Sequence, residues 1–118
     1  MDEELIQTFL EEFLGAQDES SKGRYKNAAI LFSKALFALC DLLIQDKLNK
    51  LPKNHSERFR ILEEYFKEIY GIVDDVFDKY TDSYSKPILK ETCDTIKNGI
   101  RKINEIADLP AEIEEIIK

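Results

Sequence analysis

The only histidine of the chain, His55, is the residue best suited to acid–base chemistry near neutral pH. It lies at the end of a Pro-containing loop, residues 51–55 (LPKNH), just before an amphipathic stretch. Lys53 and Arg58 are close to it in the sequence and could hold a phosphate group beside it. We therefore take His55, Lys53 and Arg58 as candidate ligand-binding residues.

His55 has two alternative roles. It could act as a base, with Glu57 or Asp41 nearby, or it could cap the following helix or join it to the preceding one. A lone histidine more often satisfies a local hydrogen bond than serves as a catalyst, so we favour the structural role. The surrounding basic residues are more often a solvated face than a binding patch: Lys47, Lys50, Lys53, Arg58 and Arg60.

Tyrosines and aspartates in the second half of the chain form two further candidate sites. Tyr80 and Tyr84, with Tyr65 and Tyr70, could line a stacking site for a base, but tyrosines at helical spacing are more often core-edge residues. An acidic run at helical spacing could bind a divalent cation, although a solvated face is the commoner explanation. The run consists of Asp74, Asp75, Asp78 and Asp82.

Metal and cofactor sites are not predicted. Cys40 and Cys93 form no CxxC pair, and with one histidine they cannot complete a four-ligand zinc site unless a carboxylate helps. We expect both cysteines to be buried, reduced thiols. The chain also lacks a Gly-rich phosphate loop, a GxSxG motif and an HExxH motif, so we expect no cofactor and no catalytic residues.

Length and charge narrow the class of protein. The 118 residues fit a single domain, and a net charge of −7 argues against non-specific nucleic-acid binding, so we expect no DNA binding. The acidic N-terminal stretch MDEELIQTFLEEFL has no basic region of the kind that begins a signal peptide. We therefore expect a cytoplasmic protein.

Apolar periodicity predicts an all-α fold, an antiparallel up-and-down bundle of four to five main helices. Gly23, Gly71 and the three prolines mark the connections, with Gly71 expected to break or kink the chain between two helices. Asp2 is an expected helix cap, and Asn54 and Ser56 are both candidates to cap the helix that follows the LPKNH loop, with Asn54 and Glu57 at the spacing of a capping box. The expected core domain spans residues 1–107, and a short C-terminal helix follows at 110–118. The main helices are expected at residues 1–22, 25–47, 56–67, 70–84 and 89–107.

The segment 25–44 is apolar on nearly every side and is therefore expected to be the central helix. Ser33, Lys34 and Asp41 interrupt it, so we expect no membrane span. Partners in a small bundle would cover only part of its circumference, and exposed apolar patches of that size are rare in monomers. This reasoning predicts a homodimer with a two-fold interface.

The order of these features resembles the HEPN family (higher eukaryotes and prokaryotes nucleotide-binding), whose members are antiparallel helical bundles and usually dimers. The resemblance covers residues 1–107 and rests on four features in order: residues 23–25 (GRY) with the Ala-rich helix from Ala28, the LPKNH loop, residues 80–84 (YTDSY), and a closing helix at 91–106. It implies a nucleotide-binding or partner module, often paired with a minimal nucleotidyltransferase. Here that enzyme would be a separate protein.

The chain departs from the ribonuclease members of this family. Those members carry an Arg four to six residues before a His, and no arginine precedes His55 at that spacing. The Arg expected in the pair around Tyr84 is also replaced, by Asp82 and Ser83. The sequence thus favours a non-catalytic module, with a ribonuclease toxin using His55 and a purely structural homodimer as the alternatives.

Overall fold

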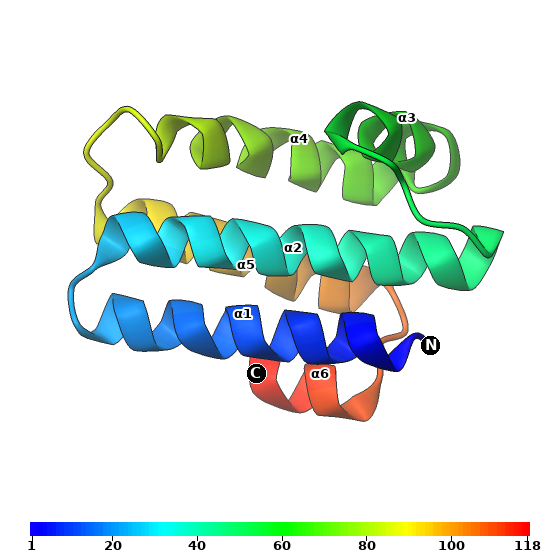
Figure 1. Ribbon diagram of the computed structural model, residues 1–118, viewed down its shortest axis with the longest axis horizontal. Helices are drawn as coiled ribbons and strands as arrows, with labels where there is room; N and C mark the ends of the chain where they lie inside the picture. Colours follow the sequence, from blue (N-terminus) through cyan, green and yellow to red (C-terminus); the bar gives the residue numbers. More distant parts are fainter.

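The computed structural model describes residues 1–118 and consists entirely of helices and their connections (Figure 1). The prediction of an all-α fold is confirmed. The six helices are α1 (Glu3–Ser21), α2 (Tyr25–Leu48), α3 (His55–Tyr65), α4 (Lys67–Asp82), α5 (Lys90–Ile106) and α6 (Ala111–Ile117).

Helices α1 and α2 form an antiparallel pair whose ends are set by local chemistry. The Asp2 carboxylate accepts a hydrogen bond from the Leu5 N–H at 3.1 Å, which caps α1 as predicted. The turn to α2 passes through Gly23 at φ 77°, a left-handed conformation that favours glycine. Phe9 and Phe13 of α1 are fully buried against α2, where Phe13 meets Phe32 edge-on.

Helix α2 is the centre of the molecule, and α1, α3, α4 and α5 all pack on it. Most of its apolar residues are buried within one chain, including Phe37, Leu39 and Ile44, while Ile30 and Leu31 are half-buried. The premise that the bundle leaves part of this circumference open is therefore wrong. Four neighbouring helices supply the cover.

Length and composition alone would allow α2 to cross a membrane, so the argument that polar interruptions exclude a span is also wrong. In the fold, 72% of its most apolar stretch is buried among the other helices. A core helix covered on all sides has the same composition as a membrane-spanning one, because both are surrounded by apolar atoms.

The chain breaks between α3 and α4 at Phe66 and not at Gly71. Phe66 has φ −139° and ψ 61°, which ends α3 and redirects the chain, whereas Gly71 lies within α4. A glycine inside a helix costs about 1 kcal/mol relative to alanine but does not end it. Asn54 caps α3 as predicted, with its side-chain oxygen accepting from the Glu57 N–H at 2.9 Å.

The apolar stripes of the sequence place Leu14, Tyr65, Leu89 and Ile106 on the buried faces of their helices, but all four are exposed. Leu14 lies at the edge of the α1 stripe, and Tyr65 and Ile106 are the last residues of their helices. Leu89 precedes the first turn of α5 and is the most exposed of the four. The last side chains of a helix can lie beyond the ends of its neighbours and stay exposed. Apolar periodicity cannot predict this, because it does not say where the neighbouring helices end.

Helices α5 and α6 close the core. Gly99 of α5 lets α4 approach, because a Cβ there would lie 3.2 Å from Ile72 and 3.3 Å from Val76. The short helix α6 docks on α1 and α5 through Ile113 and Ile117, both buried. A helix this short is marginal alone, so the segment could dock on the bundle, dock on a partner or fray, and the structure shows the first of these.

Candidate functional site

Three side chains from two helices meet where α3 packs on α2. Arg58 of α3 binds Asp41 of α2 with two parallel hydrogen bonds, from Nε to Oδ1 at 2.7 Å and from Nη2 to Oδ2 at 3.0 Å. The third guanidinium nitrogen, Nη1, lies 2.6 Å from Nδ1 of His55. Only 12% of the Arg58 side chain and 17% of the Asp41 side chain are exposed. The arrangement is a largely buried Asp41–Arg58–His55 cluster.

The protonation of His55 follows from this contact. A guanidinium nitrogen can only donate a hydrogen bond, so Nδ1 of His55 must accept and therefore carries no proton. His55 is then neutral, with its proton on Nε2. The cluster as a whole is also neutral, because the charges of Arg58 and Asp41 cancel.

Aromatic rings pack against the imidazole of His55. Phe37 of α2 and Phe77 of α4 meet the His55 ring at 4.8 and 5.1 Å between ring centroids, and Tyr80 lies at 6.0 Å. The Arg58 guanidinium also lies over the Phe37 ring at 5.3 Å. His55 thus joins α2, α3 and α4, which is the structural role that the sequence favoured.

Acidification is expected to destabilise the protein through His55. Burial and the charge of Arg58 lower the pKa of His55 below its ordinary value of 6.5, although Asp41 acts in the opposite direction. A histidine whose pKa is lowered by folding stabilises the fold fully above pH 6.5, and this stabilisation is lost as the pH falls below that value.

Urea unfolding at about pH 7.5 and about pH 5.5 measures this loss. His55→Gln is the control, since its free energy of unfolding should change less over the same interval. An equal change in the variant and the wild type would assign the pH dependence to the carboxylates.

The cluster forms one wall of a surface groove of about 280 Å³ between α1, α2, α3 and α4. Thr8 and Glu12 of α1 and Lys34 of α2 also line it. Partial burial raises the pKa of Glu12, and Lys34 acts against this rise. Besides the neutral cluster, the groove therefore offers the Glu12 carboxylate, the Lys34 ammonium group and aromatic edges, with little net charge.

The structure brings together four of the five predicted ligand-binding residues. His55, Arg58 and Tyr80 line the groove, and the Tyr84 hydroxyl lies 2.8 Å from that of Tyr80. This hydrogen bond, together with burial, raises the pKa of Tyr80 to about 12. Lys53 is the exception: it precedes α3, where its backbone N–H contacts the Glu57 carboxylate at 3.3 Å.

Sequence reasoning missed the pairing of Asp41 with Arg58. Asp41 was considered as a helper of His55, but its carboxylate binds the guanidinium instead. The signal was present, since a carboxylate on an otherwise apolar helix needs a cationic partner when it is buried. An Arg–His pair is also present in space, with the Arg one helical turn after the His rather than before it.

The other candidate groups are dispersed. No group of three or more His, Cys, Asp or Glu side chains is arranged to hold a metal ion, and the acidic run of α4 is spread along the helix surface. Cys40 is buried, and burial raises the pKa of its thiol to about 12. Cys93 donates a hydrogen bond from Sγ to the Tyr25 carbonyl at 3.2 Å. Both cysteines are free, as predicted.

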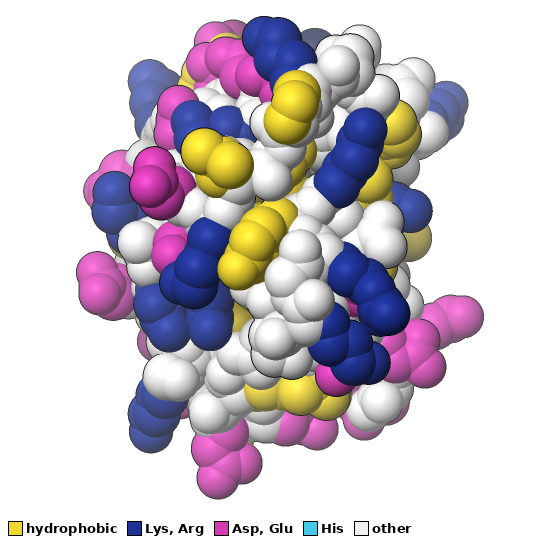
Figure 2. Space-filling model, turned by 90° about the vertical axis from the view of Figure 1, so that its left-hand side faces the viewer, with side chains coloured by type: hydrophobic (Ala, Val, Ile, Leu, Met, Phe, Trp, Pro, Cys, Tyr) yellow, Lys and Arg dark blue, Asp and Glu magenta, His cyan; other side chains and the backbone are white.

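Basic residues gather at the end of the molecule where the α1–α2 and α4–α5 connections lie (Figure 2). Carboxylates neighbour most of them. Lys22 contacts Asp18 at 2.8 Å, and Lys86 contacts Asp82 at 3.3 Å. These exposed pairs leave a face of mixed charge rather than a site for a single anion.

No family model, curated protein or solved structure matches this chain. The resemblance to the HEPN family thus stays a prediction from the sequence.

Proposed function

We propose that the protein is a non-catalytic, HEPN-like helical bundle that acts as a binding or partner module. The observation that carries this proposal is the state of its only histidine. Nδ1 of His55 accepts from Arg58, whose guanidinium is neutralised by Asp41. A general base needs a free nitrogen, and a phosphate clamp needs an uncompensated positive charge. Here Nδ1 of His55 and the charge of Arg58 are both already used in contacts that hold the helices together.

The resemblance adds the kind of partner. A HEPN-like module without catalytic residues would be accessory to a separate minimal nucleotidyltransferase, or would bind a nucleotide. The groove beside His55 supports a ligand role, since Tyr80 and Phe37 offer aromatic edges and Lys34 an ammonium group. Co-purification with a nucleotidyltransferase encoded by a neighbouring gene would test this pairing.

A ribonuclease is the second candidate, because Arg58 and His55 lie side by side at a surface groove. We expect no cleavage when the pure protein is incubated with a mixed RNA pool, since Asp41 holds the arginine in place. Gel electrophoresis of the RNA over time is the measurement. Dose-dependent cleavage that survives repeated purification, and that His55→Ala abolishes, would establish the ribonuclease instead.

The module is proposed to be a homodimer. Its support is the HEPN resemblance and several exposed apolar side chains, which include Leu14, Tyr65 and Leu89. The burial of α2 within one chain removes the earlier argument from that helix. Multi-angle light scattering at micromolar concentration is the measurement, and we expect twice the monomer mass of 13.7 kDa. A mass that stays at 13.7 kDa on concentration would contradict the dimer.

A further inference from the structure

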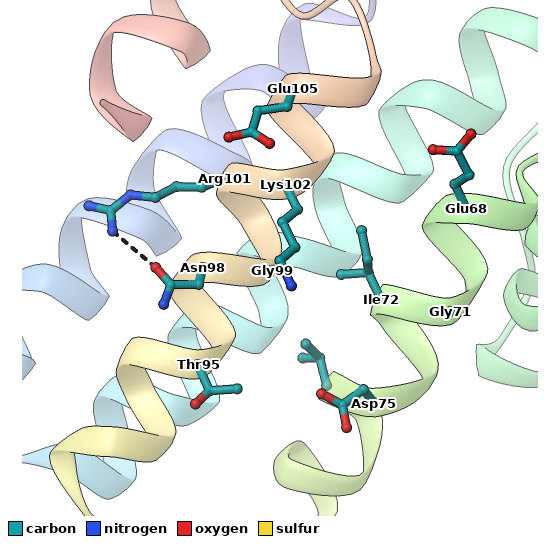
Figure 3. Close-up of a pocket in the computed structure, with 11 residues that line it drawn as sticks. Glu68, Gly71, Ile72, Asp75, Thr95, Asn98, Gly99, Arg101, Lys102 and Glu105 are labelled. Atoms are coloured by element: carbon teal, nitrogen blue, oxygen red, sulfur yellow. Dashed lines mark hydrogen bonds between the residues drawn. The ribbon is translucent and has the colours of Figure 1, made fainter.

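The groove of about 680 Å³ between α4 and α5 is larger than the groove beside His55, but its charges are balanced (Figure 3). Asp75 is paired with Lys79 at 3.7 Å. The unpaired charges of its lining are two carboxylates and two basic groups, which cancel: Glu68, Glu105, Arg101 and Lys102. No aromatic ring lines it. The smaller groove beside His55 differs, because it contains aromatic rings and a half-buried carboxylate without a partner.

The floor of the groove beside His55 is one stripe of α2. Lys34, Ala38 and Asp41 follow one another at steps of four and three residues, which places them on one side of the helix. The short side chain of Ala38 leaves room in the middle of this stripe, and α1, α3 and α4 border it. The volume of about 280 Å³ is below the range of about 300–1,000 Å³ that is typical of sites for drug-sized ligands. The groove therefore suits a small molecule.

Glu12 and Lys34 are the two charged side chains of the groove that have no partner in the chain. Asp41 and Arg58 neutralise each other, whereas neither Glu12 nor Lys34 has an opposite charge within 4 Å. Partial burial raises the pKa of Glu12, because the half-buried carboxylate has lost part of its water without gaining a hydrogen bond. The charge of Lys34 lowers the same pKa, so the two side chains lie near each other.

We propose that this groove binds a small zwitterion of the α-amino acid class, with an aromatic side chain. The ammonium group of the ligand contacts the Glu12 carboxylate, and its carboxylate contacts the Lys34 ammonium group. Its ring packs over Ala38 against the rings of Phe37 and Tyr80. This inference rests on the proposed binding-module function and names the class of ligand for its groove.

The two charges disfavour ligands that carry only one of them. An amine without a carboxylate meets the ammonium group of Lys34, and a carboxylate without an amine meets Glu12, so each gains one attraction and suffers one repulsion. A nucleotide, the ligand that the HEPN resemblance implies, brings more than one negative charge to Glu12 and no compensating cation. It is therefore the competing occupant to test.

The test titrates the full-length chain, labelled with ¹⁵N, with four probes. They are phenylalanine, phenethylamine (which lacks the carboxylate), phenylpropionate (which lacks the ammonium group) and AMP. We expect phenylalanine to shift the amide resonances of Thr8, Lys34 and Ala38 and to bind at least about tenfold more tightly than each of the other three. No binding of phenylalanine, shifts elsewhere in the chain, or equal or tighter binding of another probe would overturn the inference.

Two variants assign the contacts. Glu12→Gln should weaken phenylalanine at least about tenfold and bind phenylpropionate more tightly than the wild type does, since the repulsion of the ligand carboxylate is gone. Lys34→Gln should weaken phenylalanine to a similar extent and bind phenethylamine more tightly. Glu11→Gln and Lys26→Gln remove exposed charges from the same two helices outside the groove and are the matched controls.

Unchanged binding of phenylalanine in both groove variants, with circular dichroism confirming that they fold, would refute the site. The proposed module function would survive that result, since co-purification, RNA cleavage and light scattering test it separately.

Discussion

Replacing Asp41 with alanine is expected to lower the free energy of unfolding by about 2–4 kcal/mol. The variant leaves the Arg58 guanidinium, only 12% exposed, without its carboxylate and without the two hydrogen bonds that hold α3 on α2. A buried charge that loses its partner costs more than the net worth of the pair, because its desolvation is no longer offset. Urea unfolding followed by far-ultraviolet circular dichroism measures the change.

Two further variants test whether the loss of stability comes from the unpaired charge of Arg58 or from the lost hydrogen bonds. Asp46→Ala removes an exposed carboxylate from the same helix and should change stability by no more than about 0.5 kcal/mol. The double variant Asp41→Leu with Arg58→Met should recover much of the loss, since apolar residues of similar volume often replace a buried ion pair at little cost. A double variant no more stable than Asp41→Ala would show that the cluster contributes through its hydrogen bonds rather than by avoiding a lone charge.

Phe13→Ala is expected to cost about 3–5 kcal/mol, a large part of the stability of a domain of this size. The ring of Phe13 is fully buried, 5.5 Å from the rings of both Phe9 and Phe32. Its removal leaves a cavity between α1 and α2 that the rigid neighbouring rings cannot fill. The change in the midpoint of urea unfolding, at constant slope, gives the cost.

The neighbouring residue is the control for this prediction. Leu14 is 51% exposed, so Leu14→Ala should change stability by no more than about 0.5 kcal/mol although it too removes a large apolar side chain from α1. Equal losses at the two positions would mean that Leu14 is buried in solution, for which a dimer interface is the explanation to test first.

Features of the fold that depend on neighbours in the sequence could be predicted. Asp2 and Asn54 cap their helices through residues three positions away, and Gly23 takes the left-handed turn that no other residue type adopts freely. The break at Phe66 could not be predicted, since its cause is the direction that α4 must take to reach α2 and α5. Gly71 was the stronger local signal, but a helix tolerates one glycine.

Only part of the candidate site could be predicted, because contacts within one helix follow from the sequence whereas contacts between helices do not. His55 and Arg58 are separated by one helical turn, so their proximity follows from the helix itself. The partner of Arg58 lies 17 residues away on another helix, and only the packing of α3 on α2 decides that Asp41 binds the arginine rather than the histidine.

The central place of α2 has a consequence for the chain during its synthesis. The helix is long and apolar enough to be mistaken for a membrane segment, and three of the four helices that cover it, α3, α4 and α5, follow it in the sequence. A ribosome that has released α1 and α2 alone exposes an apolar surface that only the later helices complete. Folding therefore competes in time with recognition by membrane-targeting factors and chaperones, and slow translation of residues 55–106 would lengthen that competition.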